Sequence, residues 1–363
     1  MRRRSSLNRV SVMGLFLALL AQGAASVPAR EMQSTGVSGG AAARDSVLEQ
    51  IQKDAAVLIP HMRAGWVHRF LLATSELPSI EPRTVYHDSA RTRFWTAVEA
   101  ATLPDSEKSK LIERKLDEEF YYTTRYGSPL AYSRPFQILA EAGFDEVAGK
   151  KIVDFGYGTI GHLRLLASLG ADVTGVEVDP LLRALYSGPD DQGTIRGAGG
   201  REGRLRVLDG HFPAEPEVTT AVGEGYDLFI SKNTLKNGYI HPEQPVDPRR
   251  LVHLGVGDTA FVRAIHRILK PGGRAMIYNL CPAPNAPGKP YIPWADGRCP
   301  FPASLWRSEG FRVIAFDRDD TRAARAMGHA LGWDRGESPM DLEKDLFGSY
   351  TLVEKELELK YRD

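Results

Sequence analysis

A glycine-rich turn constrains this chain more than any other feature of its sequence. Residues 151–155 (KIVDF) form a short apolar run typical of a buried strand, and a helical pattern later extends to Leu169. Between them lies GxGxxG, with Gly156, Gly158 and Gly161. Glycines let the backbone turn tightly and let a ligand approach without a Cβ in the way. This order predicts a strand–turn–helix unit that binds a ligand at its turn.

An acidic residue follows the turn at the distance expected for ribose binding. Glu177 lies 21 residues after Gly156, at the end of the next predicted strand (172–177, DVTGVE). A carboxylate there can accept hydrogen bonds from both ribose hydroxyls, so the turn fits any nucleoside-containing cofactor, including a dinucleotide. The sequence contains no phosphate-loop motif, which argues against a nucleotide hydrolase of that class.

Two further carboxylates favour a positively charged ligand over a dinucleotide. Asp154 lies two residues before Gly156 in an otherwise apolar strand. It would repel a pyrophosphate, whereas an ammonium or sulfonium group would be attracted to it. Asp209, in VLDGHF, follows the third predicted strand, where it could accept from an adenine amino group. A cofactor that joins adenosine to a cationic group therefore fits best.

From Lys150 onward, short apolar runs alternate with helical patterns. The expected strands are 151–155, 172–177, 205–208, 226–231, 274–278, 311–316 and 348–354, and residues 187–204 are expected to be a long exposed loop. Strands alternating with helices imply right-handed crossovers and a parallel sheet. We predict an α/β fold, a Rossmann-like seven-stranded doubly wound sheet with an antiparallel C-terminal strand, preceded by a helical N-terminal extension.

Taken together, these motifs resemble the class I S-adenosylmethionine-dependent methyltransferases over about residues 150–357. The resemblance rests on the VDFGYGTIG turn, Glu177 in GVEVDP, Asp209 in LDGHF, YDLFISKNTL, and LKPGG before the fifth strand. It implies S-adenosyl-L-methionine as the cofactor. The implied cofactor-binding residues are Asp154 at the methionine amino group, Gly156, Gly158 and Gly161 at the methionine part, Glu177 at the ribose, Asp209 at the adenine, and Ser231.

The acceptor side is expected where the fourth and fifth strands end, because open α/β sheets bind ligands at their carboxyl edge. Methyl transfer is an in-line displacement that requires alignment and dryness, and a general base only if the acceptor must lose a proton. Candidate acceptor-side residues are Lys232, Asn233 and Tyr239, followed by Lys236, His241, Tyr278 and Asn279. The stretch SKNT (231–234) is not the Asn/Asp-Pro-Pro-Tyr of enzymes that methylate amide or ring nitrogens. We expect a small-molecule acceptor, with the proline-rich stretch 281–299 walling its pocket.

The front half is expected to be a helical lead-in over residues 45–144. Val47, Leu48, Ile51 and Ala55 recur at helical spacing, as do residues 94–101 and 104–120, and no strand is predicted there. Residues 120–136 (FYYTTRYGSPLAYSRPF) read either as an ordered loop with partly buried tyrosines or as a lid over a ligand. Residues 145–363 would then form the methyltransferase domain.

The N-terminus reads as a secretory signal peptide over residues 1–26. Arginines at positions 2–4 precede an apolar run from Val10 to Ala21 and a group of small residues, a pattern typical of export. The run is short for a bilayer-spanning helix, so no stable membrane insertion is expected after cleavage. Residues 27–44 form a flexible tether. An uncleaved anchor, or a true start at Met32 with a cytoplasmic protein, are the alternatives; export would permit a Cys281–Cys299 disulfide, and a cytoplasmic location two free thiols.

Composition excludes several other classes of function. Lys plus Arg and Asp plus Glu both number 46, so the chain lacks the surplus of cations on which nucleic-acid binding depends. With two cysteines and no zinc-type spacing, no metal site is predicted. Two rivals to the methyltransferase remain: an NAD(P)-dependent oxidoreductase on a Rossmann fold, and a non-catalytic S-adenosylmethionine-binding protein.

Overall fold

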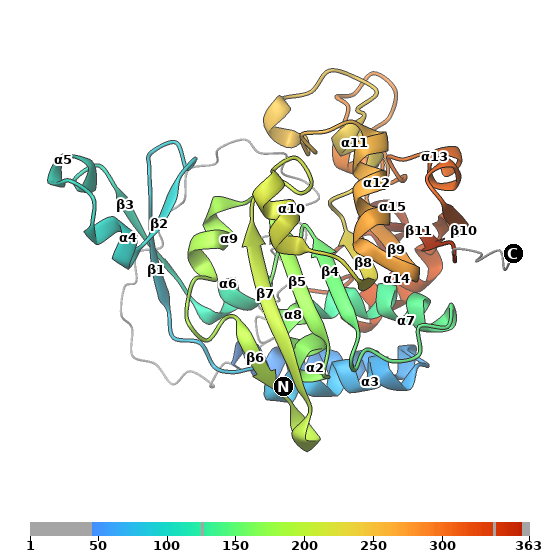
Figure 1. Ribbon diagram of the computed structural model, residues 1–363, viewed down its shortest axis with the longest axis horizontal. Coiled ribbons are helices and arrows are strands. Elements are labelled where there is room, and N and C mark those ends of the chain that lie inside the picture. The colour runs from blue at the N-terminus through green and yellow to red at the C-terminus, as the bar shows by residue number, and fades with distance from the viewer. Residues whose placement is uncertain (1–45, 125–126, 337–338, 358–363) are drawn as a thin grey trace, which may run out of the picture.

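The computed structural model describes residues 46–124, 127–336 and 339–357, so the proposed signal peptide and tether lie outside the described residues. Eight strands form the main sheet: β4 (Lys151–Phe155), β5 (Asp172–Glu177), β6 (Gly193–Arg196), β7 (Glu202–Asp209), β8 (Tyr226–Lys232), β9 (Leu269–Cys281), β10 (Phe311–Asp319) and β11 (Phe347–Lys355). Their order across the sheet is β10-β11-β9-β8-β4-β5-β7-β6 (Figure 1).

The predicted Rossmann-like fold is confirmed by the direction of the strands. β7, β5, β4, β8 and β9 are parallel neighbours, and their carboxyl ends therefore meet at one edge of the sheet. β11 pairs antiparallel with β9, and β10 pairs antiparallel with β11. Seven of the eight strands are those predicted from the sequence.

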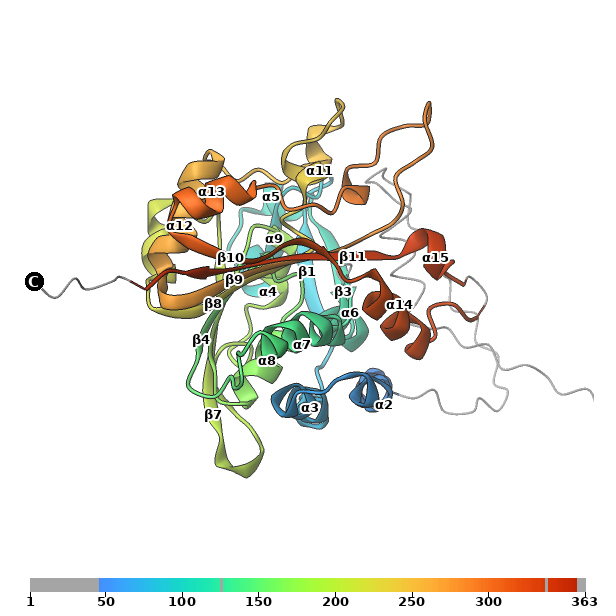
Figure 2. The ribbon, with the colours of Figure 1, turned by 90° about the vertical axis from the view of Figure 1, so that its right-hand side faces the viewer.

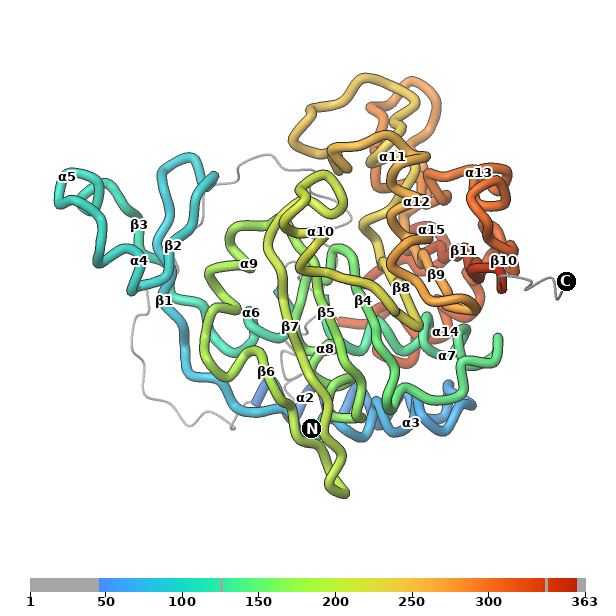
Figure 3. Tube along the Cα trace, viewed as in Figure 1, coloured from blue at the N-terminus to red at the C-terminus, as the bar shows by residue number. Residues whose placement is uncertain are grey.

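The eighth strand, β6, corrects the expectation that residues 187–204 form a loop. It pairs antiparallel with β7, and Arg196 faces Glu202 in the register. The glycines that suggested a loop instead make the turn of this hairpin, since Gly199 and Gly200 adopt φ values of 70° and 75°. The hairpin extends beyond the edge of the sheet (Figure 3).

Helices cover both faces of the sheet (Figure 2). One face carries α7 (Ser133–Glu141), α8 (Gly161–Ser168), α9 (Pro180–Leu185) and α14 (Thr321–Ala330), with α2 (Val47–Leu58) and α3 (Gly65–Leu72) as a further layer outside α7 and α8. The other face carries α10 (Pro216–Val222), α12 (Asp258–Ile268) and α13 (Ala303–Ser308). The shorter helices α11 (Asn237–Ile240) and α15 (Leu342–Asp345) follow β8 and precede β11. Each face buries its own apolar cluster: along β8, Ile230 belongs to the first cluster and Phe229 to the second, as the alternation of side chains in a strand requires.

The all-helical reading of the N-terminal region is wrong between residues 83 and 116. A separate three-stranded antiparallel sheet lies there, with β1 (Arg83–His87) between β2 (Phe94–Thr96) and β3 (Ile112–Leu116), and the short helices α4 (Ala97–Ala101) and α5 (Asp105–Lys108) in the connection. Thr96 caps α4 together with Glu99 in a capping box, so the helix cannot include the residues before it. The helical spacing of the sequence was misleading because these elements are too short for a period to be decisive.

Arginines join this small sheet to the main domain. Arg183 of α9 donates to Glu99 Oε1 at 2.7 Å and to the carbonyl oxygen of Phe94 at 2.7 Å. Arg83 of β1 pairs with the buried carboxylate of Asp191, which also accepts from Tyr121 at 2.6 Å. The lead-in is therefore packed on the main domain. No helix within the described ranges is long and apolar enough to cross a membrane.

Candidate functional site

The glycine turn lies at the carboxyl edge of the sheet, directly after β4. Gly156 and Gly158 have φ values of 74° and 61°, in the left-handed region that favours glycine. A Cβ on Gly156 would lie 2.2 Å from the hydroxyl oxygen of Thr234, and one on Gly161 would lie 3.0 Å from the Cβ of Pro129. The sequence analysis attributed these glycines to the approach of a ligand. In the structure, close contacts with Thr234 and Pro129 already leave little or no room for a side chain at Gly156 and Gly161.

Glu177 and Asp209 are brought side by side, because they are paired in the register of β5 and β7. The half-buried Glu177 carboxylate accepts from the amides of Val178 at 2.8 Å and of Gly158 at 3.3 Å. Burial raises the pKa of Glu177 to about 7. Asp209 is exposed, and desolvation raises its pKa as well. Two acids predicted from separate motifs therefore form one acidic pair beside the turn.

Asp154 is completely buried, and its two carboxylate oxygens differ in their hydrogen bonds. Its Oδ2 lies 2.5 Å from Nε2 of His162, and the side chain of Tyr132 also interacts with the carboxylate, while Oδ1 has no hydrogen-bond partner among the described residues. The imidazole stacks on the ring of Tyr132, with centroids 3.6 Å apart. Burial lowers the pKa of His162, against the opposing effect of Asp154, so the neutral imidazole donates to the carboxylate. This pair places a buried carboxyl group two residues before the first glycine of the turn.

Two buried lysines follow the same strand but differ in their contacts. The Nζ of Lys236 donates to the carbonyl oxygens of Leu280 at 2.6 Å and Trp294 at 3.2 Å, so it holds the loop that follows β9. The ammonium of Lys232 makes no hydrogen bond to a described residue, and its Nζ lies 5.7 Å from the ring centroid of Tyr132. Burial lowers the pKa of each lysine to about 8. The nearby Asp154 opposes this effect and raises the pKa of Lys232, so the two side chains interact electrostatically.

Several predicted site residues have framework roles. The hydroxyl of Ser231 donates to the carbonyl of Phe155 at 2.9 Å and so joins β8 to β4. Asn233 adopts a φ of 63° and accepts from the amide of Leu280 at 2.7 Å, which joins β8 to β9. Tyr239 is half-buried next to Lys236, and burial raises its pKa to about 12, so its phenol stays neutral. These residues shape the edge of the sheet.

Two other candidate residues, His241 and Asn279, make hydrogen bonds within the protein, and His211 lies on the surface. His241 pairs with Asp258 at 2.9 Å on the surface, and His211 is exposed. Asn279 donates to the carbonyl oxygens of Leu235 and Gly297 at 2.9 Å each. These contacts hold together the loops that follow β8 and β9.

Sequence reasoning missed a buried network around Asp320. Asp320 precedes α14 but makes no side-chain cap; instead it accepts from Arg134 Nη2 at 2.6 Å and from the hydroxyl of Tyr278 at 3.1 Å. Arg134 lies in the aromatic segment 120–136, whose unusual composition was the only available signal. The partners are 186 residues apart in the chain, so no local pattern could have joined them.

Segment 120–136 lies over the glycine turn. The hydroxyl of Thr124 donates to the carbonyl of Gly158 at 2.9 Å, and that of Thr159 donates to the carbonyl of Tyr122 at 2.7 Å. Residues 125–126 of the segment lie outside the described ranges. The rest is mostly helical, with the end of α6 (Glu118–Thr123), a 3-10 turn over Pro129–Tyr132 and the start of α7, so the loop interpretation is wrong in its secondary structure. The described tyrosines are buried, and the lid interpretation stays a prediction.

A cavity of about 520 Å³ lies at the carboxyl ends of the sheet beyond β9, next to the proline-rich loop. Its lining includes Cys281, Tyr291, Asp317 and Phe347. Cys281 and Cys299 are both buried free thiols, so of the two alternatives the structure has the unbridged one. The loop 281–299 thus walls a space large enough for a small organic molecule.

No family model matches the sequence, and no curated protein matches it. Solved structures with similar folds include an S-adenosylmethionine-dependent methyltransferase from Mesorhizobium loti, at 18% identity over 60% of this chain and 97% of that one, with a TM-score of 0.34. A putative sarcosine dimethylglycine methyltransferase from Galdieria sulphuraria is 14% identical over 64% and 88% of the two chains, with a TM-score of 0.36. A magnesium protoporphyrin IX methyltransferase from Synechocystis, with bound SAH, is 14% identical over 62% and 83%, with a TM-score of 0.31. At these identities and TM-scores, the comparisons do not determine the function of this protein.

Proposed function

We propose that this protein is an S-adenosylmethionine-dependent methyltransferase that acts on a small-molecule acceptor. The observation that carries the proposal is the carboxylate of Asp154, which is buried immediately before the glycine turn and keeps one oxygen without a partner. A buried, unpaired carboxylate oxygen favours a cationic group nearby and disfavours a pyrophosphate. That is the distinction between a sulfonium-type donor and a nicotinamide dinucleotide.

Residues at and near the turn could contact each part of such a methyl donor: the methionine part, the ribose and the adenine. Asp154 would accept from the methionine ammonium, and Lys232, the neighbouring cation without a hydrogen bond, would meet the methionine carboxylate. Glu177 would accept from the ribose hydroxyls, since a carboxylate has about four acceptor sites and its present amide contacts leave some free. Asp209 would lie at the adenine. In this proposal Lys232 binds the methyl donor, whereas the sequence analysis placed it on the side of the methyl acceptor.

Catalysis would then consist of alignment and exclusion of water. When bound, the donor supplies a methyl group already activated by the adjacent sulfonium. Segment 120–136 would keep water from the turn, and the cavity beside loop 281–299 would hold the acceptor. Tyr239, with its pKa raised to about 12 by burial, is not suited to act as a base near neutral pH. We therefore assign no general base.

Calorimetry with S-adenosylhomocysteine, S-adenosylmethionine and NAD⁺ tests the proposal directly. We expect the first two to bind and NAD⁺ not to bind. Binding of NAD⁺ alone would instead support the oxidoreductase alternative. Tight binding of the methyl donor without turnover across a broad panel of acceptors would support the non-catalytic alternative. We also propose export by residues 1–26, which fractionation of cells carrying a C-terminally tagged protein would test.

Asp209→Asn should weaken binding of S-adenosylhomocysteine by about fivefold to tenfold without lowering the melting temperature. The side chain is exposed, so its replacement leaves packing intact, and a hydrogen bond from a ligand contributes about 0.5–1.5 kcal/mol. Glu202→Gln, at the other end of the same strand, is the matched control and should bind like the wild type. Equal affinities in both variants would remove Asp209 from the site.

A further inference from the structure

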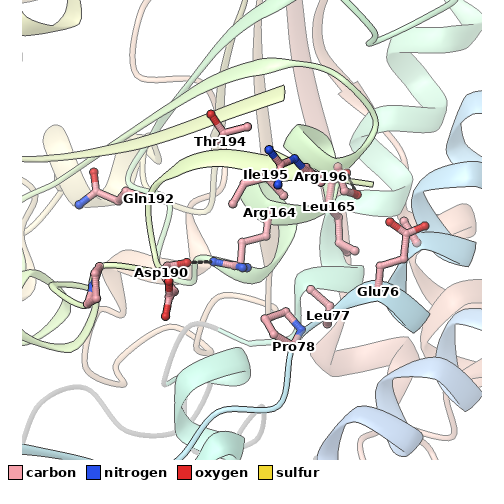
Figure 4. Close-up of a pocket in the computed structure, with 13 residues that line it drawn as sticks. Glu76, Leu77, Pro78, Arg164, Leu165, Asp190, Gln192, Thr194, Ile195 and Arg196 are labelled. Atoms are coloured by element: carbon pink, nitrogen blue, oxygen red, sulfur yellow. Dashed lines mark hydrogen bonds between the residues drawn. The ribbon is translucent and has the colours of Figure 1, made fainter. Parts of the chain in front are cut away.

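A second cavity, of about 260 Å³, lies away from the turn, between α8, the β6 hairpin and the lead-in (Figure 4). Its lining includes Leu165 of α8 and Ile195 of β6. β6 pairs with the amino-terminal part of β7, where Arg196 faces Glu202. Asp209 lies at the opposite, carboxyl-terminal end of β7. The cavity is therefore separate from the edge at which the methyl donor would bind.

Arg164 extends from α8 into this cavity (Figure 4). Its Nη1 donates to the backbone carbonyl of Asp190 at 2.6 Å, and this is the only hydrogen bond from the guanidinium to a described residue. Its Nε is buried without a hydrogen-bond partner. The Nε–Nη2 edge, which can donate two parallel hydrogen bonds to an oxyanion, is thus left unused. A buried N–H without an acceptor is unfavourable, so an acceptor in the cavity would stabilise the protein.

The other polar groups of the cavity offer further donors and limit the charge of a ligand. Gln192 accepts from the amide of Val207 at 2.8 Å through Oε1, which leaves its two amide hydrogens available. Arg196 also lines the cavity and pairs with Glu202 at 3.4 Å, and the acids Glu76 and Asp190 offset the two arginines, so a ligand with two negative charges is less favoured than one with a single charge. Pro78 contributes apolar surface that suits a short hydrocarbon group.

We propose that this cavity binds a small organic carboxylate, whose two oxygens pair with the Nε–Nη2 edge of Arg164. The site does not depend on the proposed methyl transfer, since its residues are not those of the turn. A single negative charge on a short apolar body fits the guanidinium fork of Arg164, the apolar walls, and a lining in which two arginines are offset by two acids. Inorganic phosphate, which carries more charge at neutral pH, is the less favoured oxyanion.

The test is thermal unfolding of the full chain at constant ionic strength with propionate, alanine or inorganic phosphate added. We expect propionate or alanine to raise the unfolding midpoint by about 2 °C or more at saturating concentration. Arg164→Lys keeps the charge but removes the fork, so it should weaken binding at least tenfold, and Arg164→Met should abolish it. The matched control is Arg263→Lys. Arg263 is an exposed arginine on α12 that pairs with Glu309.

Calorimetry with S-adenosylhomocysteine separates this site from the turn and also checks folding. The Arg164 variants should keep the wild-type affinity for that compound. Absence of any carboxylate-dependent shift, stabilisation by phosphate alone, or equal carboxylate binding by the wild type and Arg164→Lys would each overturn the proposal.

Discussion

Replacing Glu177 by glutamine is expected to weaken binding of S-adenosylhomocysteine by about tenfold to a hundredfold. The ribose hydroxyls would lose a charged acceptor, and hydrogen bonds to charged groups contribute about 1.5–3 kcal/mol. Calorimetry at pH 8 measures the effect, because the wild-type carboxylate, whose pKa burial raises to about 7, is then ionised. In the wild type, affinity should also fall as the pH drops below 7 and the carboxylate becomes protonated.

The same substitution should stabilise the unliganded protein at pH 8. The pKa of Glu177 is raised from 4.5 to about 7 in the folded state, so between these values the folded chain binds more protons than the unfolded chain. Wild-type stability therefore falls as the pH rises through this window. Glutamine avoids the burial of a charge, and the gain in the free energy of unfolding at pH 8 is at most about 3 kcal/mol. Denaturant unfolding at pH 5 and pH 8 should show the gain only at the higher pH.

Asp172→Asn is the matched control, since it removes an exposed acid at the start of the same strand. It should change neither the affinity nor the pH dependence of unfolding. If Glu177→Gln bound S-adenosylhomocysteine as tightly as the wild type, the ribose assignment would be wrong, whatever happened to its stability.

Lys232→Met should raise the free energy of unfolding at pH 7 by about 2–3 kcal/mol and weaken binding of the methyl donor at least tenfold. Lys232 is 6% exposed, and burial lowers its pKa from 10.5 to about 8. At pH 7 the folded chain must carry this charge without a hydrogen bond, and methionine fills a similar volume without it. A substitution that stabilises a protein while removing its activity identifies a residue kept for function.

The pH dependence of this gain has a definite sign. Between pH 8 and 10.5 the unfolded chain binds more protons at Lys232 than the folded chain, so wild-type stability attributable to this residue rises with pH in that window. The advantage of Lys232→Met should therefore shrink from pH 7 to pH 10. An advantage that did not change with pH would indicate a packing effect instead of the removal of a buried charge.

Lys236→Met is the informative comparison, because burial lowers the pKa of Lys236 to the same value of about 8. Its ammonium satisfies the carbonyl oxygens of Leu280 and Trp294, and methionine would leave both buried without a donor. Each unsatisfied group costs about 1–3 kcal/mol. We expect Lys236→Met to be at least 2 kcal/mol less stable than Lys232→Met; equal stabilities would show that the hydrogen bonds of Lys236 do not matter.

Local sequence was sufficient to predict those candidate site residues that depend on short spacing. Asp154, Gly158 and Glu177 were predicted because a strand, a turn and the next strand place them within about two dozen residues of one another. Asp209 followed from the third strand, since parallel neighbours end at the same edge. The β1–β3 sheet and β6 were missed, because strands of three to five residues have too few positions for periodicity to separate them from helix or loop.

The remaining assignments required tertiary structure. The sequence alone determined the doubly wound sheet and the acids at the carboxyl ends of β4, β5 and β7, because alternation and spacing are properties of neighbouring residues. Only the folded chain decided that the ammonium of Lys232 lacks a hydrogen bond to a described residue while that of Lys236 has two, that Tyr132 stacks on His162, and that Arg134 reaches Asp320. Such contacts join residues far apart in the chain, and whether a buried charge finds a partner depends on which backbone groups the packing brings within hydrogen-bond distance.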